Sequence, residues 1–214
     1  MLTPGKSGRD GKKIEYLQQD KEWRHFDKDL FDALRKTVVD DKDRRVASAE
    51  TAAVLDPDVF SFHTETLKDD VDQRRDFFRK FLSLAEGKDL IFFDADIGLE
   101  VKGIRCGRKD SSKYLYLDEL SVAFNKQHSI VIFQFYRQIK AEAVINQRTS
   151  QIFSCLDVNT IASFETPSVI FFLIPQPQHM DEMKERCKEI HQAWPGELCA
   201  VWHQRPDESR QTRP

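Results

Sequence analysis

Three carboxylates lie close together in the middle of the sequence. Their residue types and spacing suit metal binding or acid–base catalysis better than those of any other group in the sequence. Asp94, Asp96 and Glu100 directly follow an apolar run at residues 90–93. Carboxylate oxygens are ligands that Mg²⁺ accepts in proteins. A positioned carboxylate also accepts a hydrogen bond from an amino group or acts as a general base. We therefore interpret these three residues as candidate catalytic residues.

A basic segment follows the carboxylates. Residues 102–113 carry five Lys or Arg side chains, and Tyr114 comes next. Clustered positive charge favours contact with phosphates, and an aromatic ring can stack on a base. We select Lys102, Lys113 and Tyr114 as candidate substrate-binding residues, with nucleic acid as the partner of the 102–114 loop. A solvated surface turn is the alternative interpretation.

Gln134 and Arg137 follow a second apolar run, at residues 129–135. A glutamine and an arginine at a strand exit could bind a carboxylate or a phosphate group of a ligand. Polar capping of the strand is the alternative. If the two apolar runs are neighbouring strands, these residues lie at the same edge of the sheet as Asp94.

The elements that would position these residues follow from hydrophobic periodicity. We expect helices at residues 29–38, 70–85, 117–126, 138–156 and 180–194, and strands at 44–49, 58–62, 89–94, 129–135, 160–164, 168–174 and 198–203. The two apolar strands, 89–94 and 129–135, are expected to be buried on both faces.

Helices and strands alternate from residue 70 onward. Such alternation predicts an α/β fold with a Rossmann-like, mainly parallel sheet and helices on both faces. The short turn at 165–167 predicts an antiparallel hairpin strand near the C-terminal edge. We expect the 89–94 strand to be central, because ligands of such sheets bind outside the carboxyl ends of the strands.

The length of 214 residues suits one large domain. We expect a flexible N-terminus at residues 1–12, a single α/β domain at 13–204 and a loose C-terminal tail at 205–214. The net charge is −3. A chain that coats nucleic acid is usually basic, so such binding would depend on a local patch.

The sequence excludes several classes of protein. It has no apolar run long enough to span a membrane and no apolar signal core at its start. Its four cysteines form no CxxC pair, which predicts free thiols in a cytoplasmic protein. No histidine spacing indicates a zinc site. The oligomeric state stays open.

The central segment resembles a known family. The residues IFFDADIGLEVKG (91–103) and SSKYLYLDEL (111–120) resemble the boxes F-L-D-P-D-N-G-L-E and S-K-Y-V-Y-W-D-E-L of an uncharacterised bacterial family. Residues 10–17 and 26–38 look like two earlier segments of that family. The resemblance spans roughly residues 10–175, and it implies that this chain lacks the family's N-terminal part.

The aspartate box of that family is similar to the D-P-P-Y box of adenine-type methyltransferases, which have a Rossmann-like sheet. There the box follows the fourth strand and binds the target amino group. The resemblance implies that Asp94 is the catalytic aspartate and that Gln134 and Arg137 line the same cleft. It implies S-adenosylmethionine as the cofactor, with Glu50 as the residue that binds its ribose. This chain departs from the pattern at Ala95 and Ile97, where the family has proline and asparagine.

Three interpretations of function follow. The first is a methyltransferase-like protein that acts on nucleic acid with S-adenosylmethionine, or a degenerate relative of one. The second is a metal-dependent nuclease or phosphotransferase, in which the 94–102 carboxylate and lysine cluster would hold Mg²⁺ or Mn²⁺. The third is a non-catalytic interaction protein of the same fold. Whether the chain is an enzyme stays open at this point.

Overall fold

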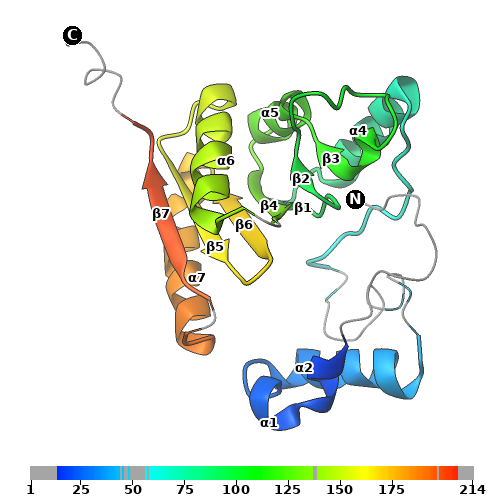
Figure 1. Cartoon of the computed structure of the whole chain (residues 1–214), viewed down its shortest axis with the longest axis vertical. Coiled ribbons are helices and arrows are strands. Elements are labelled where there is room, and N and C mark those ends of the chain that lie inside the picture. The colour runs from blue at the N-terminus through cyan, green and yellow to red at the C-terminus, as the bar shows by residue number, and fades with distance from the viewer. Residues whose placement is uncertain are drawn as a thin grey trace. The chain divides into compact units, whose positions relative to one another are not determined.

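The computed structural model describes residues 14–43, 45, 48, 56, 58–136, 139–196 and 198–206. They form two compact units, one ending at Thr64 and the other beginning at Glu65 (Figure 1). None of the helices in these described ranges combines the length and apolarity that crossing a bilayer requires.

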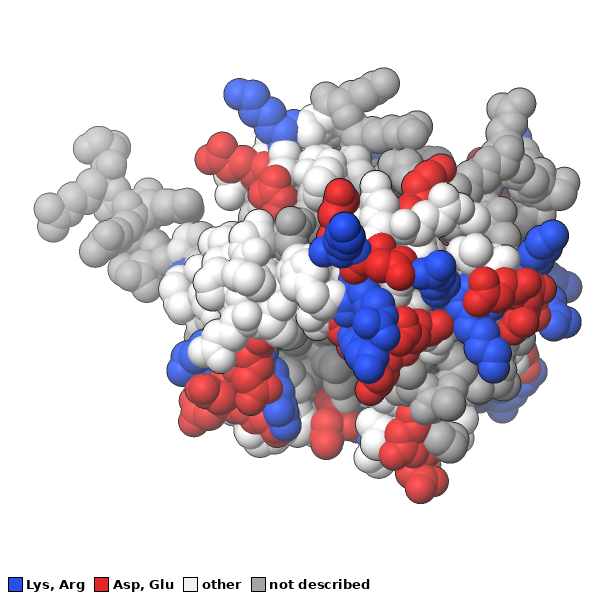
Figure 2. Space-filling view, turned by 90° about the horizontal axis from the view of Figure 1, so that it is seen from below, with Lys and Arg blue, Asp and Glu red and all other residues white. Residues whose placement is uncertain are grey.

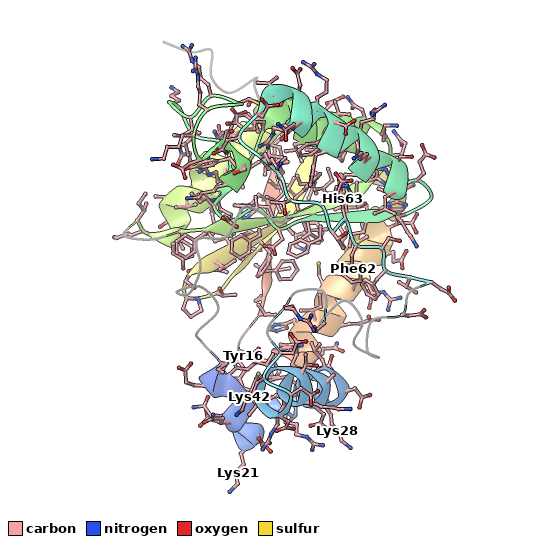
Figure 3. The ribbon with its side chains drawn as sticks, turned by 90° about the vertical axis from the view of Figure 1, so that its right-hand side faces the viewer. Tyr16, Lys21, Lys28, Lys42, Phe62 and His63 are labelled. Atoms are coloured by element: carbon pink, nitrogen blue, oxygen red, sulfur yellow. The ribbon has the colours of Figure 1, made fainter. Side chains whose placement is uncertain are left out.

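The first unit contains short helices. They are η1 (Glu15–Gln18), α1 (Asp20–Trp23), α2 (Lys28–Arg35) and η2 (Lys36–Asp40), so the predicted 29–38 helix is present as α2 and η2. The Asp27 side chain accepts a hydrogen bond from the Leu30 amide, which caps α2. Lys21 and Lys28 extend from these helices (Figure 3). On the face that Figure 2 displays, Lys and Arg side chains lie beside Asp and Glu side chains.

The predicted strand at 58–62 is absent from the described residues of this unit. The Asp56 carbonyl accepts hydrogen bonds from the amides of Val59 and Phe60, at 3.0 and 2.8 Å. The Asp56 side chain accepts a third from the Asp58 amide, at 2.9 Å. These bonds form a turn, so the amides are not available to a neighbouring strand. The predicted strand at 44–49 lies largely outside the described residues.

The second unit is built on a five-stranded sheet. Its order is β1 (Leu90–Phe93), β4 (Ser129–Phe135), β6 (Val169–Ile174), β5 (Thr160–Glu165) and β7 (Ala200–Gln204). β1 and β4 are parallel, whereas the other three pairs are antiparallel. The prediction of a mainly parallel sheet was therefore wrong. The β5–β6 pair confirms the predicted antiparallel hairpin.

The error has a physical cause. An apolar strand is expected in a parallel sheet because helices cover both faces of such a sheet. Here β6 is antiparallel and apolar, yet it is also covered on both sides. Phe172 points into the main core, and Leu173 packs in a second cluster with Cys187 on the opposite face. The apolar composition of a strand therefore indicates that both of its faces are covered, but it does not indicate whether the strand is parallel or antiparallel to its neighbours.

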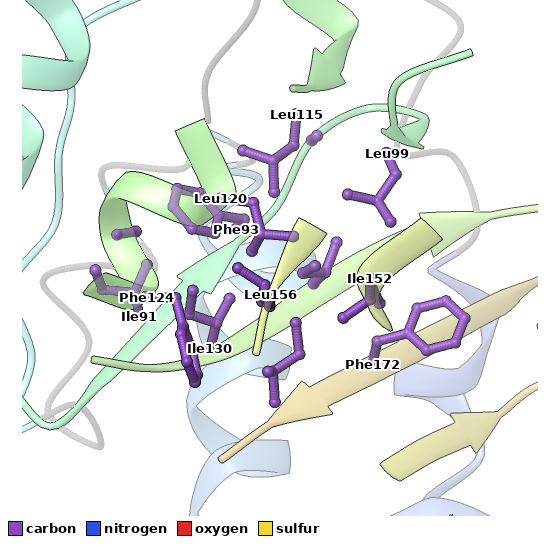
Figure 4. Close-up of a cluster of buried hydrophobic side chains, with 14 of the residues drawn as sticks. Ile91, Phe93, Leu99, Leu115, Leu120, Phe124, Ile130, Ile152, Leu156 and Phe172 are labelled. Carbon is purple, nitrogen blue, oxygen red and sulfur yellow. The ribbon is translucent and has the colours of Figure 1, made fainter. Parts of the chain in front are cut away.

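Helices cover both faces of the sheet, as predicted. α4 (Val71–Leu84), α5 (Leu117–Asn125) and α6 (Ala141–Cys155) contribute to the main core, and α7 (Met180–Ala193) packs on the other face. Figure 4 shows the centre of the main core, where side chains of α5, α6 and several strands meet.

β1 differs from its prediction in two respects. It is the edge strand of the described sheet, not a central strand. Its side chains alternate, since Ile91 and Phe93 are buried whereas Leu90 and Phe92 are 44% and 52% exposed. Alternate residues of a strand point to opposite faces. β1 is therefore covered by helices on one face only.

Candidate functional site

The aspartate box begins where β1 ends. β1 and β4 are parallel, so their carboxyl ends point toward the same edge of the sheet. Asp94 and Asp96 are exposed, whereas Ala95 between them is fully buried in the main core. The alternation turns both carboxylates away from the core. Ala95 contributes its methyl group to the main core.

The backbone of the box is held by Gln134. Its Oε1 accepts a hydrogen bond from the Leu99 amide at 3.1 Å. Its Nε2 donates to the carbonyls of Ile97 at 2.8 Å and Phe135 at 2.9 Å. The Phe135 amide also donates to the Ile97 carbonyl at 3.0 Å. Gln134 thus lies at the edge where the sequence placed it, but both of its amide N–H groups bind backbone.

The chain then forms a small parallel pair of strands, β2 (Gly98–Leu99) and β3 (Tyr114–Leu115). The Ile97 amide donates to the Lys113 carbonyl at 3.0 Å. Tyr114 is buried and registers with Gly98. This pairing places the start of the SSKYLYLDEL segment beside the aspartate box, so the two segments are joined by strand pairing.

Glu100 has a structural contact that the sequence did not predict. Its Oε1 accepts a hydrogen bond from the Leu117 amide at 2.9 Å, at the first residue of α5. A carboxylate is stabilised at a helix N-terminus by the unpaired amides there. Glu100 is therefore committed to α5. In the described part of the chain, no group of three His, Cys, Asp or Glu side chains is arranged to hold a metal ion.

The two predicted lysines differ in their contacts, because Lys113 is paired with an acid and Lys102 is exposed in a turn. Lys113 forms an ion pair with Asp110 at 2.9 Å. That hydrogen bond, with a further contribution from Asp96, raises the pKa of Lys113. Asp96 and Lys113 therefore lie close enough to interact. Lys102 is exposed in the turn after Glu100. Two other predicted residues, Glu50 and Arg137, lie outside the described residues.

The basic loop is anchored by Asp69, which the sequence analysis missed. Its carboxylate accepts hydrogen bonds from the amides of Asp110 and Ser112, each at 2.7 Å, and from Ser111 Oγ at 3.3 Å. Burial raises the pKa of Asp69, but these hydrogen bonds outweigh it and the net pKa is lowered. Nothing in the sequence distinguishes Asp69 from the neighbouring acids, because its partners are more than 40 residues away.

A buried ion pair supports the other side of the loop. Arg74 of α4 is 1% exposed. It donates to Glu119 Oε2 at 2.8 Å and to the carbonyls of Ser111 and Tyr114 at 3.0 and 2.7 Å. Its guanidinium also lies 4.7 Å from the centre of the Tyr116 ring. Glu119 lies in the first turn of α5, and it also neutralises the charge of Arg74. The Arg74 guanidinium in turn holds the Tyr114 carbonyl of β3.

A second buried arginine, Arg148 of α6, was also missed. It is 5% exposed. Its Nη1 donates to the Glu100 carbonyl at 2.9 Å and to Gln151 Oε1 at 2.7 Å. The amphipathic pattern of residues 138–156 predicts the helix but not a buried arginine within it.

The site is therefore an edge of the sheet whose backbone is held by side-chain hydrogen bonds. Gln134, Glu100, Asp69 and Arg74 hold the backbone, and the carboxylates of Asp94 and Asp96 are presented to solvent with Lys113 nearby. No protein-family model, curated protein or solved structure matches this chain.

Proposed function

We propose that the chain is a methyltransferase-like protein that binds the amino group of a nucleic-acid base at Asp94. The observation that carries this proposal is the position of Asp94. It is the first residue after β1, it is exposed, and it lies at the edge toward which β1 and β4 both run. A ligand of an α/β sheet binds at such an edge.

The arrangement of the sheet supports the proposal. In the methyltransferases that the sequence resembles, the aspartate box follows a strand of the sheet, and an antiparallel hairpin strand ends it. Here the box follows β1, which is an edge strand, and β5 and β6 form an antiparallel hairpin in which β6 lies between β4 and β5. β1, β4 and β5 consequently run in one direction. This likeness is one of fold, and by itself it does not carry an activity.

In this proposal Asp94 positions the amino group that receives the methyl group. A carboxylate accepts a hydrogen bond from an exocyclic N–H, which orients the amino nitrogen. Lys113 lies next to the box and would contact the phosphate of the same nucleotide, whereas the Tyr114 ring is buried and would not stack on the base. S-adenosylmethionine would supply the methyl group for transfer to that nitrogen.

The non-catalytic interpretation is the second candidate, and a separate observation favours it. The amide of Gln134 and the carboxylate of Glu100 are both bonded to backbone. Asp94 and Asp96 are the exposed carboxylates of the box. In this interpretation the edge binds an amino group without transferring a methyl group. The metal-dependent alternative has weaker support, since Glu100 is committed to α5.

Calorimetric titration of the full chain tests the proposal. The ligands are a short adenine-rich single-stranded oligonucleotide and S-adenosylmethionine, each with wild type, Asp94→Ala and Asp72→Ala. Asp72 is an exposed acid of α4 and serves as the control. A hydrogen bond to a charged group contributes about 1.5–3 kcal/mol, so Asp94→Ala should weaken oligonucleotide binding about tenfold or more, with Asp72→Ala unchanged.

The outcomes separate the candidates. Incorporation of methyl groups into the oligonucleotide, lost in Asp94→Ala, would support the methyltransferase assignment. Oligonucleotide binding without cofactor binding or methylation would support the non-catalytic candidate. Binding of Mg²⁺ or Mn²⁺ that Asp94→Ala abolishes would instead indicate metal-dependent phosphodiester chemistry.

A further inference from the structure

Arg148 carries a pair of donors that the protein does not use. Its Nη1 is bonded to the Glu100 carbonyl and to Gln151. Within the described residues, Nε is buried and has no hydrogen-bond partner. Nη2 also makes no hydrogen bond there, but it is not among the buried unpaired atoms, so it reaches the surface. One edge of the guanidinium is therefore unpaired and accessible at one end.

The charge of Arg148 is not neutralised by an ion pair with any carboxylate in the described ranges of the chain. Glu100 is close enough to interact electrostatically with Arg148, and its Oε1 accepts a hydrogen bond from the Leu117 amide. A buried charge without a partner is unfavourable. Burial lowers the pKa of Arg148, and Tyr114 and Glu100 lie close enough to offset part of that effect.

The position of Arg148 relates it to the candidate site. Helical side chains lean toward the N-terminus of their helix, so Arg148 reaches from α6 back toward β2. Its bond to the Glu100 carbonyl confirms this. The Glu100 amide is in turn bonded to the Leu115 carbonyl, one residue after Tyr114. The Tyr114 hydroxyl makes no hydrogen bond to the described residues and is not a buried unpaired atom.

We propose that Nη2 of Arg148 binds an oxyanion, a phosphate or carboxylate group, with the Tyr114 hydroxyl as a second donor. A guanidinium N–H is a charged donor that suits these anions. Nε is buried, so it senses the bound anion through the same guanidinium without contacting it. The site uses residues other than Asp94, and it does not depend on binding of an amino group there.

Nuclear magnetic resonance of the uniformly ¹⁵N-labelled full chain tests the site without any activity assay. The Nε–H signals of the arginines are recorded while inorganic phosphate, acetate or sodium chloride is added at matched ionic strength. Arg148→Lys identifies the Arg148 signal by its loss. Gln151→Leu, which removes a contact at Nη1 only, identifies it independently if Arg148→Lys does not fold. Arg75→Lys, at an exposed arginine of α4, is the control.

We expect the Arg148 signal to shift and saturate with phosphate or acetate, while the Arg75 signal does not. Tyr114→Phe should weaken this binding several-fold. Preference for phosphate would indicate a phosphate-bearing ligand, and preference for acetate a carboxylate-bearing one. A response to chloride as large as that to the oxyanions, or no shift of the Arg148 signal in the folded chain, would overturn the proposal.

Discussion

Gln134 and Gly98 approach so closely that a Cβ atom added to Gly98 would lie 2.5 Å from Gln134 Oε1. Gln134 binds the backbone on both sides of this glycine, at Ile97 and Leu99. Gly98 also has φ of +118°, a conformation that side chains disfavour. The Gln134 side-chain amide, together with the Phe135 backbone amide, thus fixes the aspartate box to the end of β4, and a glycine is required beside Gln134.

Gly98→Ala should destabilise the protein more than Gly103→Ala. Both glycines have positive φ, at +118° and +105°, but a Cβ at Gly103 would meet nothing within 4 Å. Each substitution costs the strain of the backbone, about 1–3 kcal/mol. Gly98→Ala adds a clash that overpacks the interior, about 1–3 kcal/mol more. Denaturant unfolding of the two variants measures the difference, and equal losses would show that Gln134 moves aside freely.

Phe93→Ala and Phe92→Ala should differ strongly, although the residues are neighbours. Phe93 is fully buried and packs against Phe81 of α4, with ring centres 5.4 Å apart. Its loss should reduce the free energy of unfolding by about 3–5 kcal/mol. Phe92 is 52% exposed, so its loss should cost much less. Chemical denaturation of both variants checks this. A similar cost for the two would contradict the assignment of β1 as covered on one face.

Glu119→Gln should destabilise the chain because it leaves Arg74 buried without a counter-charge. Loss of one partner of a buried pair typically costs about 3–5 kcal/mol. Asp76→Asn, which removes an exposed pairing with Arg79, should change stability little. Thermal unfolding of both variants, with Arg74→Met/Glu119→Leu as a third, gives the comparison. The double variant should recover part of the loss, and a further loss would contradict the account.

The Asp69 anchor should make stability depend on pH. Since the net pKa of Asp69 is lowered in the folded chain, its contribution is fully present above the pKa of the unfolded chain, near 3.8. It is lost as pH falls through the lower folded value. Wild type should therefore lose more stability below about pH 4 than Asp69→Asn does. Unfolding curves at several pH values measure this, with Asp72→Asn as the control. Parallel curves for wild type and Asp69→Asn would refute the anchor.

Much of the fold could be predicted from the sequence, because periodicity reports local structure. The helix at 70–85 and the strand at 129–135 correspond closely to α4 and β4. The hairpin of β5 and β6 follows from a short turn between two strands. Strand direction and order elsewhere depend on contacts between distant residues. The apolar pattern of 89–94 could not show that β1 would be an edge strand.

The sequence could predict that Asp94 and Gln134 lie at one edge of the sheet, but it could not predict the contacts of these residues. Gln134 lies at the expected edge, yet hydrogen bonds to Ile97 and Leu99 are invisible in the sequence. In the sequence Glu100 looks equivalent to Asp94 and Asp96, and its bond to the Leu117 amide is seen only in the structure. In a sequence, a buried arginine cannot be distinguished from an arginine on the polar face of an amphipathic helix. The sequence therefore did not indicate that Arg148 is buried.

The measurement that tests the central claim most directly is calorimetric titration of wild type and Asp94→Ala with the adenine-rich oligonucleotide. The account predicts saturable binding to wild type, weakened about tenfold or more in Asp94→Ala and unchanged in Asp72→Ala. Equal binding by all three proteins, or no binding by a wild-type chain shown to be folded, would contradict the assignment of Asp94 as the residue that binds the amino group.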